Sequence, residues 1–222
     1  MVVETAKKND FVELKYTGYA NGIIFDSNIE EDLKKLDAKA KPTKTIISVG
    51  NEMLVKGFDK ALEGKEIGKE YDVTFGHGEG FGQRDRKLMQ VVPLKEFHSK
   101  NIDPRPGMSL AIDDRLVKIV AVSGARVTID FNSPLAGKEI KYKFTIIRKV
   151  SDEKEKCDAL FATFFRMVPP YEIKEKVIVK GPKGFDIFVN AFKDKFKELI
   201  GKSLEFEEMK LEDKKEEKAD KK

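Results

Sequence analysis

Residues 49–62 read Val49-Gly50-Asn51-Glu52-Met53-Leu54-Val55-Lys56-Gly57-Phe58-Asp59-Lys60-Ala61-Leu62. The apolar side chains between Leu54 and Leu62 return at the spacing of one helix face, so the stretch predicts a short amphipathic helix. Gly64 is expected to end this helix. Residues 45–49 before it and 71–75 after it have the pattern of strands, so the chain places a helix between strands here.

The chain before this stretch predicts a β-hairpin. Residues 9–20 alternate between two sets of side chains, and the set of Val12, Leu14 and Tyr16 is expected to face a core. Asn21-Gly22 is a tight-turn signal, after which a second strand begins. Residues 28–44 are polar and helix-prone, which indicates a short helix in a surface loop.

A β-rich unit is predicted from about residue 86 to residue 131. Four short β-rich runs and one turn of helix account for it: 88–93, 95–100 (the helix), 108–112, 117–122 and 126–131. Residues 142–150 alternate again and should return to the first sheet.

The last third of the chain predicts helix, strand, helix, strand. Asp152 and Glu155 have capping-box spacing, and the first helix should continue to Pro169-Pro170. Residues 171–180 predict one strand, residues 185–200 an amphipathic helix and residues 204–209 a last strand. Residues 212–222 are almost all charged and predict a disordered tail.

Composition indicates a protein of the cytoplasm. The 222 residues carry 43 basic and 39 acidic side chains, and the net charge of +4 is too small to favour nucleic-acid binding. No apolar run approaches the ~20 residues of a membrane span, and the N-terminus does not have the pattern of a secretory signal. Cys157 is the single cysteine, and it is expected to be a helix residue and not a nucleophile.

Other features of the composition concern metal, nucleotide and source. His77 and His98 are the only histidines, which predicts no metal site. The loop Gly76–Gly82 lacks the spacing of a phosphate-binding glycine loop, so no nucleotide or other cofactor is expected. Abundant Lys and Glu with no Trp suggest a thermophilic source, although a Lys/Glu-rich mesophile would fit as well.

Four further segments accompany residues 49–62: Tyr16-Thr17-Gly18, Ile24-Phe25-Asp26-Ser27, Gly80-Phe81-Gly82 and Asn132-Ser133-Pro134-Leu135-Ala136-Gly137-Lys138-Glu139. In residue type, order and spacing the set resembles the FKBP-type peptidyl-prolyl cis/trans isomerases. The long gap between Gly82 and Asn132 is similar to the SlyD-like branch, which carries a domain inserted in its flap. The extra C-terminal region is similar to long archaeal-type members.

This resemblance implies an α+β fold with an antiparallel FKBP sheet wrapped on a short helix, a small β-rich insert and a small α/β C-terminal domain. The expected divisions are the FKBP catalytic domain at 1–85 and 132–150, the insert-in-flap domain at 86–131, the C-terminal domain at 151–211 and the tail at 212–222.

The resemblance also assigns a site. Catalytic roles fall on Tyr16, Asp26, Phe58 and Phe81, and substrate-binding roles on Phe25, Leu54, Val55 and Phe144. Phe58 would be the floor under the proline ring, where relatives often have Trp. Phe81 stands where many relatives have Tyr, so a hydroxyl donor is lost. No proton transfer is needed, because the reaction only twists an amide.

In the SlyD-like branch the insert binds unfolded polypeptide, so unfolded proline-containing chains are the expected partners. The candidate client-binding residues of the insert are apolar: Leu88, Met89, Val91, Val92, Phe97, Met108 and Leu110. Met suits promiscuous binding because it is flexible and polarisable. The same residues could instead form the core of the β-rich unit.

The function implied is a peptidyl-prolyl cis/trans isomerase with chaperone activity. Alternatives are a holdase-type chaperone with weak isomerase activity and a ribosome-associated factor that acts through its lysines. The C-terminal region holds eight of the sixteen phenylalanines, which could form a homodimer interface, an exposed client-binding surface or a core of their own.

Overall fold

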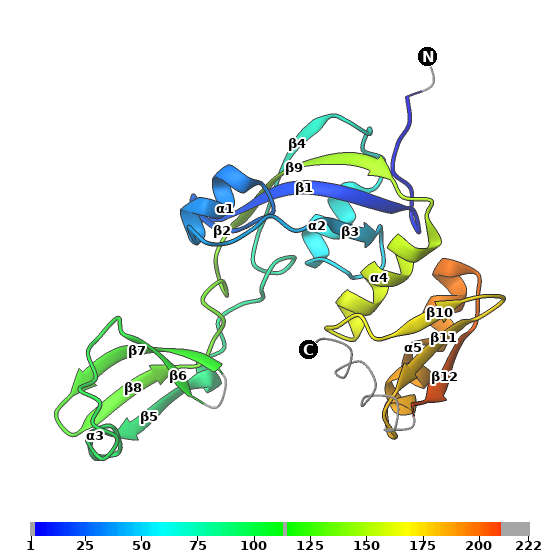
Figure 1. Cartoon of the computed structure of the whole chain (residues 1–222). Helices are drawn as coiled ribbons and strands as arrows, with labels where there is room; N and C mark the ends of the chain where they lie inside the picture. Colours follow the sequence, from blue (N-terminus) through cyan, green and yellow to red (C-terminus); the bar gives the residue numbers. More distant parts are fainter. Residues whose placement is uncertain (1–2, 113–114, 210–222) are drawn as a thin grey trace, which may run out of the picture.

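The computed structural model describes residues 3–112 and 115–209. It contains three sheets and several short helices, so the α+β class predicted from the sequence is confirmed (Figure 1). The predicted tail at 212–222 lies outside the described residues. Among the residues described, no helix is both long and apolar enough to span a bilayer.

The first sheet has the strand order β2-β1-β9-β4, and β3 also pairs with β1. Its elements are β1 (Phe11–Ala20), β2 (Ile23–Ser27), β3 (Thr45–Ser48), β4 (Glu70–Phe75) and β9 (Ile140–Lys149), with α1 (Glu30–Leu36) and α2 (Lys56–Leu62). The predicted hairpin is present, since β1 pairs with β2 in the antiparallel sense. Asn21 and Gly22 of its turn both take positive φ, of 49° and 80°. Helix α2 buries Phe58 and Leu62 against the sheet, as its apolar stripe predicts.

The second sheet lies between Asp85 and Asn132 and has the order β5-β8-β7-β6. Its elements are η1 (Arg86–Leu88), β5 (Met89–Pro93), α3 (Leu94–His98), β6 (Ser109–Ile112), β7 (Arg115–Ser123) and β8 (Arg126–Asp130). It has its own core around Phe97, Ile119 and Ile129. In Figure 1 this sheet, which we call the insert, stands apart from the first sheet at the end of two linking segments.

Asn132 ties the two linking segments together. Its side-chain oxygen accepts from the Asp85 amide at 2.8 Å, and its side-chain nitrogen donates to the Asp85 carbonyl at 3.0 Å. Asp130, which is 4% exposed, accepts from the Asn132 side chain at 2.6 Å and forms an ion pair with Arg84. Further along, the Gly137 amide donates to the Gly82 carbonyl at 2.8 Å.

The C-terminal unit, residues 151–209, forms a third sheet of order β10-β11-β12 with two helices. Its elements are α4 (Glu153–Phe164), β10 (Tyr171–Ile173), β11 (Val177–Gly181), α5 (Asp186–Ile200) and β12 (Leu204–Glu208). Asp152 caps α4 by accepting from the Glu155 amide at 2.8 Å, as predicted. Gly201, at φ 80°, ends α5.

Two predictions for this unit are wrong. The first helix does not continue to Pro169: α4 ends at Phe164, and Arg166 takes a left-handed φ of 59° that turns the chain away. Residues 171–180 do not form one strand. They form the antiparallel pair β10 and β11, closed by a turn in which the Lys174 amide donates to the Lys176 carbonyl at 2.9 Å.

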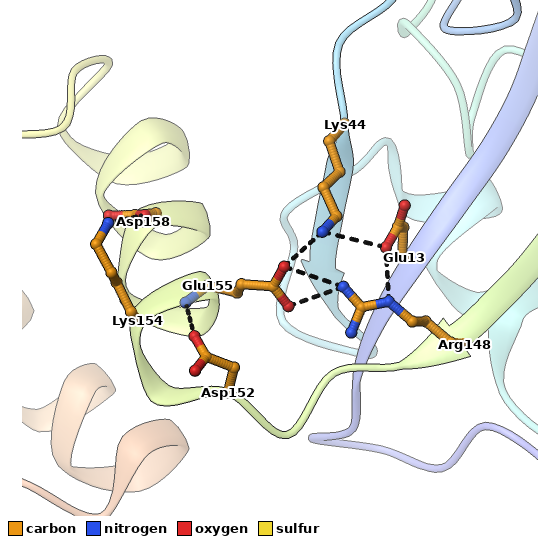
Figure 2. A network of polar contacts seen from close by, with 7 residues as sticks. All are labelled: Glu13, Lys44, Arg148, Asp152, Lys154, Glu155 and Asp158. Atoms are coloured by element: carbon orange, nitrogen blue, oxygen red, sulfur yellow. Dashed lines mark hydrogen bonds and ion pairs between the residues drawn. The ribbon is translucent and has the colours of Figure 1, made fainter.

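The C-terminal unit packs directly on the first sheet. Its core includes Phe11 of β1 and Val150, and Met53 contacts both this core and that of the first sheet. A polar network reinforces the contact (Figure 2). In it, Arg148 donates to Glu13 at 2.8 Å and to Glu155 of α4 at 2.8 Å, while Lys44 pairs with both carboxylates.

Candidate active site

Aromatic side chains from β1, β9 and α2 meet on the helix side of the first sheet. The ring of Phe58 stacks on that of Tyr142, with centroids 4.2 Å apart and planes 13° apart. Tyr16 lies edge-on to Phe58 at 5.8 Å and is 5.9 Å from Tyr142. Phe58 is 1% exposed, so its ring is enclosed by the rings around it.

The predicted residue Phe144 does not lie beside Phe25 in this cluster. Phe144 is 1% exposed and packs behind Phe58 and against Tyr71, at 5.1 and 5.7 Å between ring centroids. Tyr142, two residues earlier on the same face of β9, lies 5.8 Å from Phe25. Sequence reasoning placed Phe144 in the wall and missed Tyr142.

The strand register explains why Tyr142 reaches the cluster. Gly18 of β1 pairs with Tyr142 on one side and with Asp26 of β2 on the other. A Cβ atom on Gly18 would stand 2.8 Å from the Tyr142 ring and 2.9 Å from the Phe25 ring. Gly18 therefore allows both rings to lie directly over the backbone.

Asp26 and Tyr16 form the polar part of the cluster. The Tyr16 hydroxyl donates to the Asp26 carboxylate at 3.0 Å. Burial raises the pKa of both Tyr16 and Tyr142, and the nearby Asp26 charge raises it further. Both phenols therefore stay neutral at physiological pH, and the Tyr16 hydroxyl is held as a hydrogen-bond donor to Asp26.

Leu54 and Val55 lie in the turn that leads into α2, where both are half-buried against the first core. Val55 is the N-cap residue, with extended backbone angles. Within the described parts of the chain, its amide makes no hydrogen bond to protein. The turn thus presents one unoccupied backbone donor beside an apolar floor.

A buried carboxylate fixes this turn. Asp59, 5% exposed, accepts from the Gly50 amide at 2.8 Å and the Glu52 amide at 2.9 Å. Gly50 and Glu52 both take positive φ, of 74° and 58°, so the turn needs such support. Sequence reasoning missed this role of Asp59, although an acidic residue on the apolar side of a predicted helix is a signal for it.

Phe81 closes the cluster from the glycine-rich loop. Its ring is edge-on to Phe25 at 5.6 Å, and it is half-buried. The loop is attached to α2 through the Gly57 amide, which donates to the Glu79 carbonyl at 2.8 Å. The structure therefore brings together Tyr16, Phe25, Asp26, Leu54, Val55, Phe58 and Phe81 from the predicted set.

The predicted client-binding residues of the insert divide into two groups. Leu88, Met89, Val91 and Met108 are exposed, with Val91 at 60%. Phe97 is 5% exposed and Val92 and Leu110 pack around it, so these three contribute to the core of the insert, as the alternative prediction has it. The same three residues also line a groove of 410 Å³, together with Ile102.

Other sites considered from the sequence have the following surroundings. Cys157 is buried, and burial raises the pKa of its thiol to about 12, so it is not a thiolate nucleophile. Within residues 3–112 and 115–209, no group of three His, Cys, Asp or Glu side chains could hold a metal ion.

Residues 3–98 match the family described as FKBP-type peptidyl-prolyl cis-trans isomerase, and residues 90–135 match the FKBP26 IF domain. A short-type peptidyl-prolyl cis-trans isomerase of Methanocaldococcus jannaschii is 34% identical over 150 residues, which cover 65% of this chain and 94% of that protein. SlyD of Escherichia coli K12, an FKBP-type isomerase, is 35% identical over 111 residues, which cover 47% of this chain and 56% of SlyD. SlyD of Helicobacter pylori is 26% identical over 159 residues, which cover 68% and 79%.

Proposed function

Because this chain belongs to the FKBP-type peptidyl-prolyl cis-trans isomerases, we propose that its aromatic cluster is the site that accelerates rotation about X–Pro bonds in polypeptides. The observation that carries the proposal is the set of rings around Phe58, with the Tyr16–Asp26 hydrogen bond at one side and the Val55 amide at another. The set combines an apolar floor with few polar groups.

The chemistry of the amide explains why such a site suffices. Rotation about a peptide bond faces a barrier of ~18–20 kcal/mol, since nitrogen lone-pair delocalisation holds the amide planar. Twisting the bond removes this delocalisation and reduces the charge separation. Apolar surroundings such as Phe58 and Tyr142 therefore favour the twisted amide over the planar one.

The polar groups supply orientation. In our proposal the Val55 amide donates to a substrate carbonyl and so fixes the peptide over Phe58. Asp26 lies at the rim, where its carboxylate, held by the Tyr16 hydroxyl, biases the field at the rotating carbonyl. Phe25 and Phe81 enclose the proline ring from the opposite side. Tyr142 takes the wall position that the sequence assigned to Phe144.

We further propose that the domains divide as the sequence indicates, and that the insert binds unfolded, proline-containing chains for the neighbouring site. This is supported by the exposed apolar side chains Leu88, Met89, Val91 and Met108 and by the groove of 410 Å³. A holdase with weak isomerase activity is the second candidate, and the absence of a hydroxyl at Phe81 favours it.

A tetrapeptide assay tests the catalytic assignment. We expect the protein to accelerate cis/trans exchange of a prolyl tetrapeptide, and Phe58→Leu and Asp26→Asn each to lower kcat/KM about tenfold or more. Unchanged exchange rates in both variants would contradict the assignment. If the wild-type protein suppresses aggregation but does not accelerate cis/trans exchange, the holdase function is favoured. The control is Ile23→Asn, a change at a 73% exposed position on β2.

A further inference from the structure

A groove lies between the edge of the first sheet and the C-terminal unit. It has a volume of 490 Å³. One wall is formed by β3 and the turn after it, with Thr45, Ile46, Met53 and Leu54, and the other by α4, with Ala159 and Ala162. Most of these side chains are apolar, so the groove offers an apolar track bordered by charged residues.

The groove begins at the candidate active site. Leu54 lines the groove and also packs in the aromatic cluster's core, one residue before the Val55 amide. At the other end, Asp158 and Val168 also line a second hollow of 460 Å³ that leads to Pro169 and Pro170. Val168 is 47% exposed, which leaves an apolar side chain accessible between the two hollows.

Strand β3 lies at the edge of the first sheet and forms part of the groove wall. It pairs with β1 on one side, and the Ser48 amide points away from β1, since it donates to the Met53 sulfur at 3.1 Å. Backbone groups alternate along an edge strand, so the amide and carbonyl of Ile46 point the same way. An extended peptide can add to such an edge through main-chain hydrogen bonds while its side chains enter the groove.

Ion pairs join the two walls of the groove. Glu155 of α4 pairs with Arg148 at 2.8 Å and with Lys44, and these two cations also reach Glu13 (Figure 2). Lys195 of α5 donates to the Asn51 side chain at 2.5 Å, next to the turn before α2. The charges at the border thus satisfy one another, and α4 is held at a fixed position beside β3.

We propose that this groove binds the extended segment of the same polypeptide that flanks the bound proline on one side. The inference rests on the proposed function, because the occupant is the substrate of the aromatic site. The C-terminal unit then forms half of a substrate groove and contributes to peptide affinity. Because the groove meets the candidate site at Leu54, only the segment on one side of the proline can follow it.

Three peptides and two matched variants test this inference. The peptides are a prolyl tetrapeptide and two versions of it extended to about ten residues, one on the N-terminal and one on the C-terminal side. Ala162→Trp would block the groove at an exposed position of α4, and Ala191→Trp is the matched change at an exposed position of α5 that does not line the groove. Val168→Glu is a second change within the groove.

The measured quantity is kcat/KM for an extended peptide divided by kcat/KM for the tetrapeptide. We expect Ala162→Trp and Val168→Glu to lower this ratio about tenfold for one of the two extended peptides. The ratio for the other extended peptide, and both ratios in Ala191→Trp, should stay at the wild-type value. Equal ratios in all proteins would overturn the inference while leaving the isomerase intact. A wild-type protein inactive on every peptide would instead contradict the proposed function. A change in sedimentation of Ala162→Trp without a change in ratio would assign the groove to self-association and overturn the inference as well.

Discussion

At the scale of single residues, the aromatic cluster depends on which ring of β9 stands opposite a glycine. Tyr142 pairs with Gly18, whereas Phe144 pairs with Tyr16, so only Tyr142 can extend over the backbone toward Phe25. The two residues share one face of the strand and are separated by about 7 Å. The alternating pattern predicts the shared face, but it contains no information on which residue reaches the site.

Leucine substitutions separate the two positions. We expect Tyr142→Leu to lower kcat/KM on a prolyl tetrapeptide severalfold more than Phe144→Leu, because Tyr142 stacks on Phe58 beside the rim. Phe144→Leu should instead lower the free energy of unfolding by about 1–2 kcal/mol through imperfect repacking of the core. Urea denaturation and exchange assays on the same samples measure both effects. A larger loss of activity in Phe144→Leu than in Tyr142→Leu would support the substrate-binding role that the sequence predicted for Phe144.

At the scale of elements, the strongest patterns predict the structure well. Alternation predicts β1, β4 and β9, and the apolar stripe predicts α2 and α5. The turn between β10 and β11 could not be predicted, since Lys174-Glu175-Lys176 contains no glycine or proline. Instead, Glu172 stabilises this hairpin, with Lys174 at 2.6 Å and Lys180 at 2.5 Å.

This arrangement predicts an acid-sensitive hairpin. Hydrogen bonds from Lys174 and Lys180 lower the pKa of Glu172 from 4.5 to about 2. A lowered carboxylate pKa contributes stability above pH 4.5, and this stability is lost as the pH falls toward 2. We expect Glu172→Gln to reduce the fall in melting temperature across that window. The effect should be small because the side chain is 39% exposed.

The melting temperature of each protein between neutral pH and about pH 2 measures this effect. Glu175→Gln, an exposed position in the same turn, is the matched control and should follow the wild-type curve. An identical dependence on pH in the wild type and Glu172→Gln would exclude the carboxylate as the source of acid sensitivity.

At the scale of the whole molecule, the sequence predicts three β-containing regions but not how the last one packs. Phe11 belongs to the strand face predicted to point away from the core, yet it is 3% exposed, because the C-terminal unit covers it. A pattern within one strand cannot reveal a second core on its other face. The eight C-terminal phenylalanines are therefore partly accounted for by this shared core, while Phe188 remains 56% exposed.

Replacing residues 86–131 by a short glycine linker tests the role of the insert. The ends to be joined are close, because the Asn132 side chain contacts the Asp85 backbone at 2.8 Å. We expect a large loss of acceleration in the refolding of a proline-limited protein and little loss on a tetrapeptide, which needs no second binding surface. Equal losses on both substrates would show that the insert supports the aromatic site itself.

A milder variant keeps the insert folded. Val91→Lys changes a 60% exposed apolar side chain of β5, and Ile23→Lys changes a 73% exposed one on the first hairpin. We expect only Val91→Lys to slow refolding of the protein substrate. Fluorescence anisotropy of a labelled unfolded chain should show the matching loss of affinity.

The paired contacts of Asn132 with Asp85 also have a mechanical consequence. The two linking segments are also joined by the Arg84–Asp130 ion pair and by the Gly137 amide, which donates to the Gly82 carbonyl, so they act as one stalk and not as two separate tethers. A joined stalk opposes translation of the insert, so under the proposed client binding a bound chain would stay within the reach of the stalk from the first sheet. The local concentration of the prolines of that chain at Phe58 would then be set by the length of the stalk and not by free diffusion.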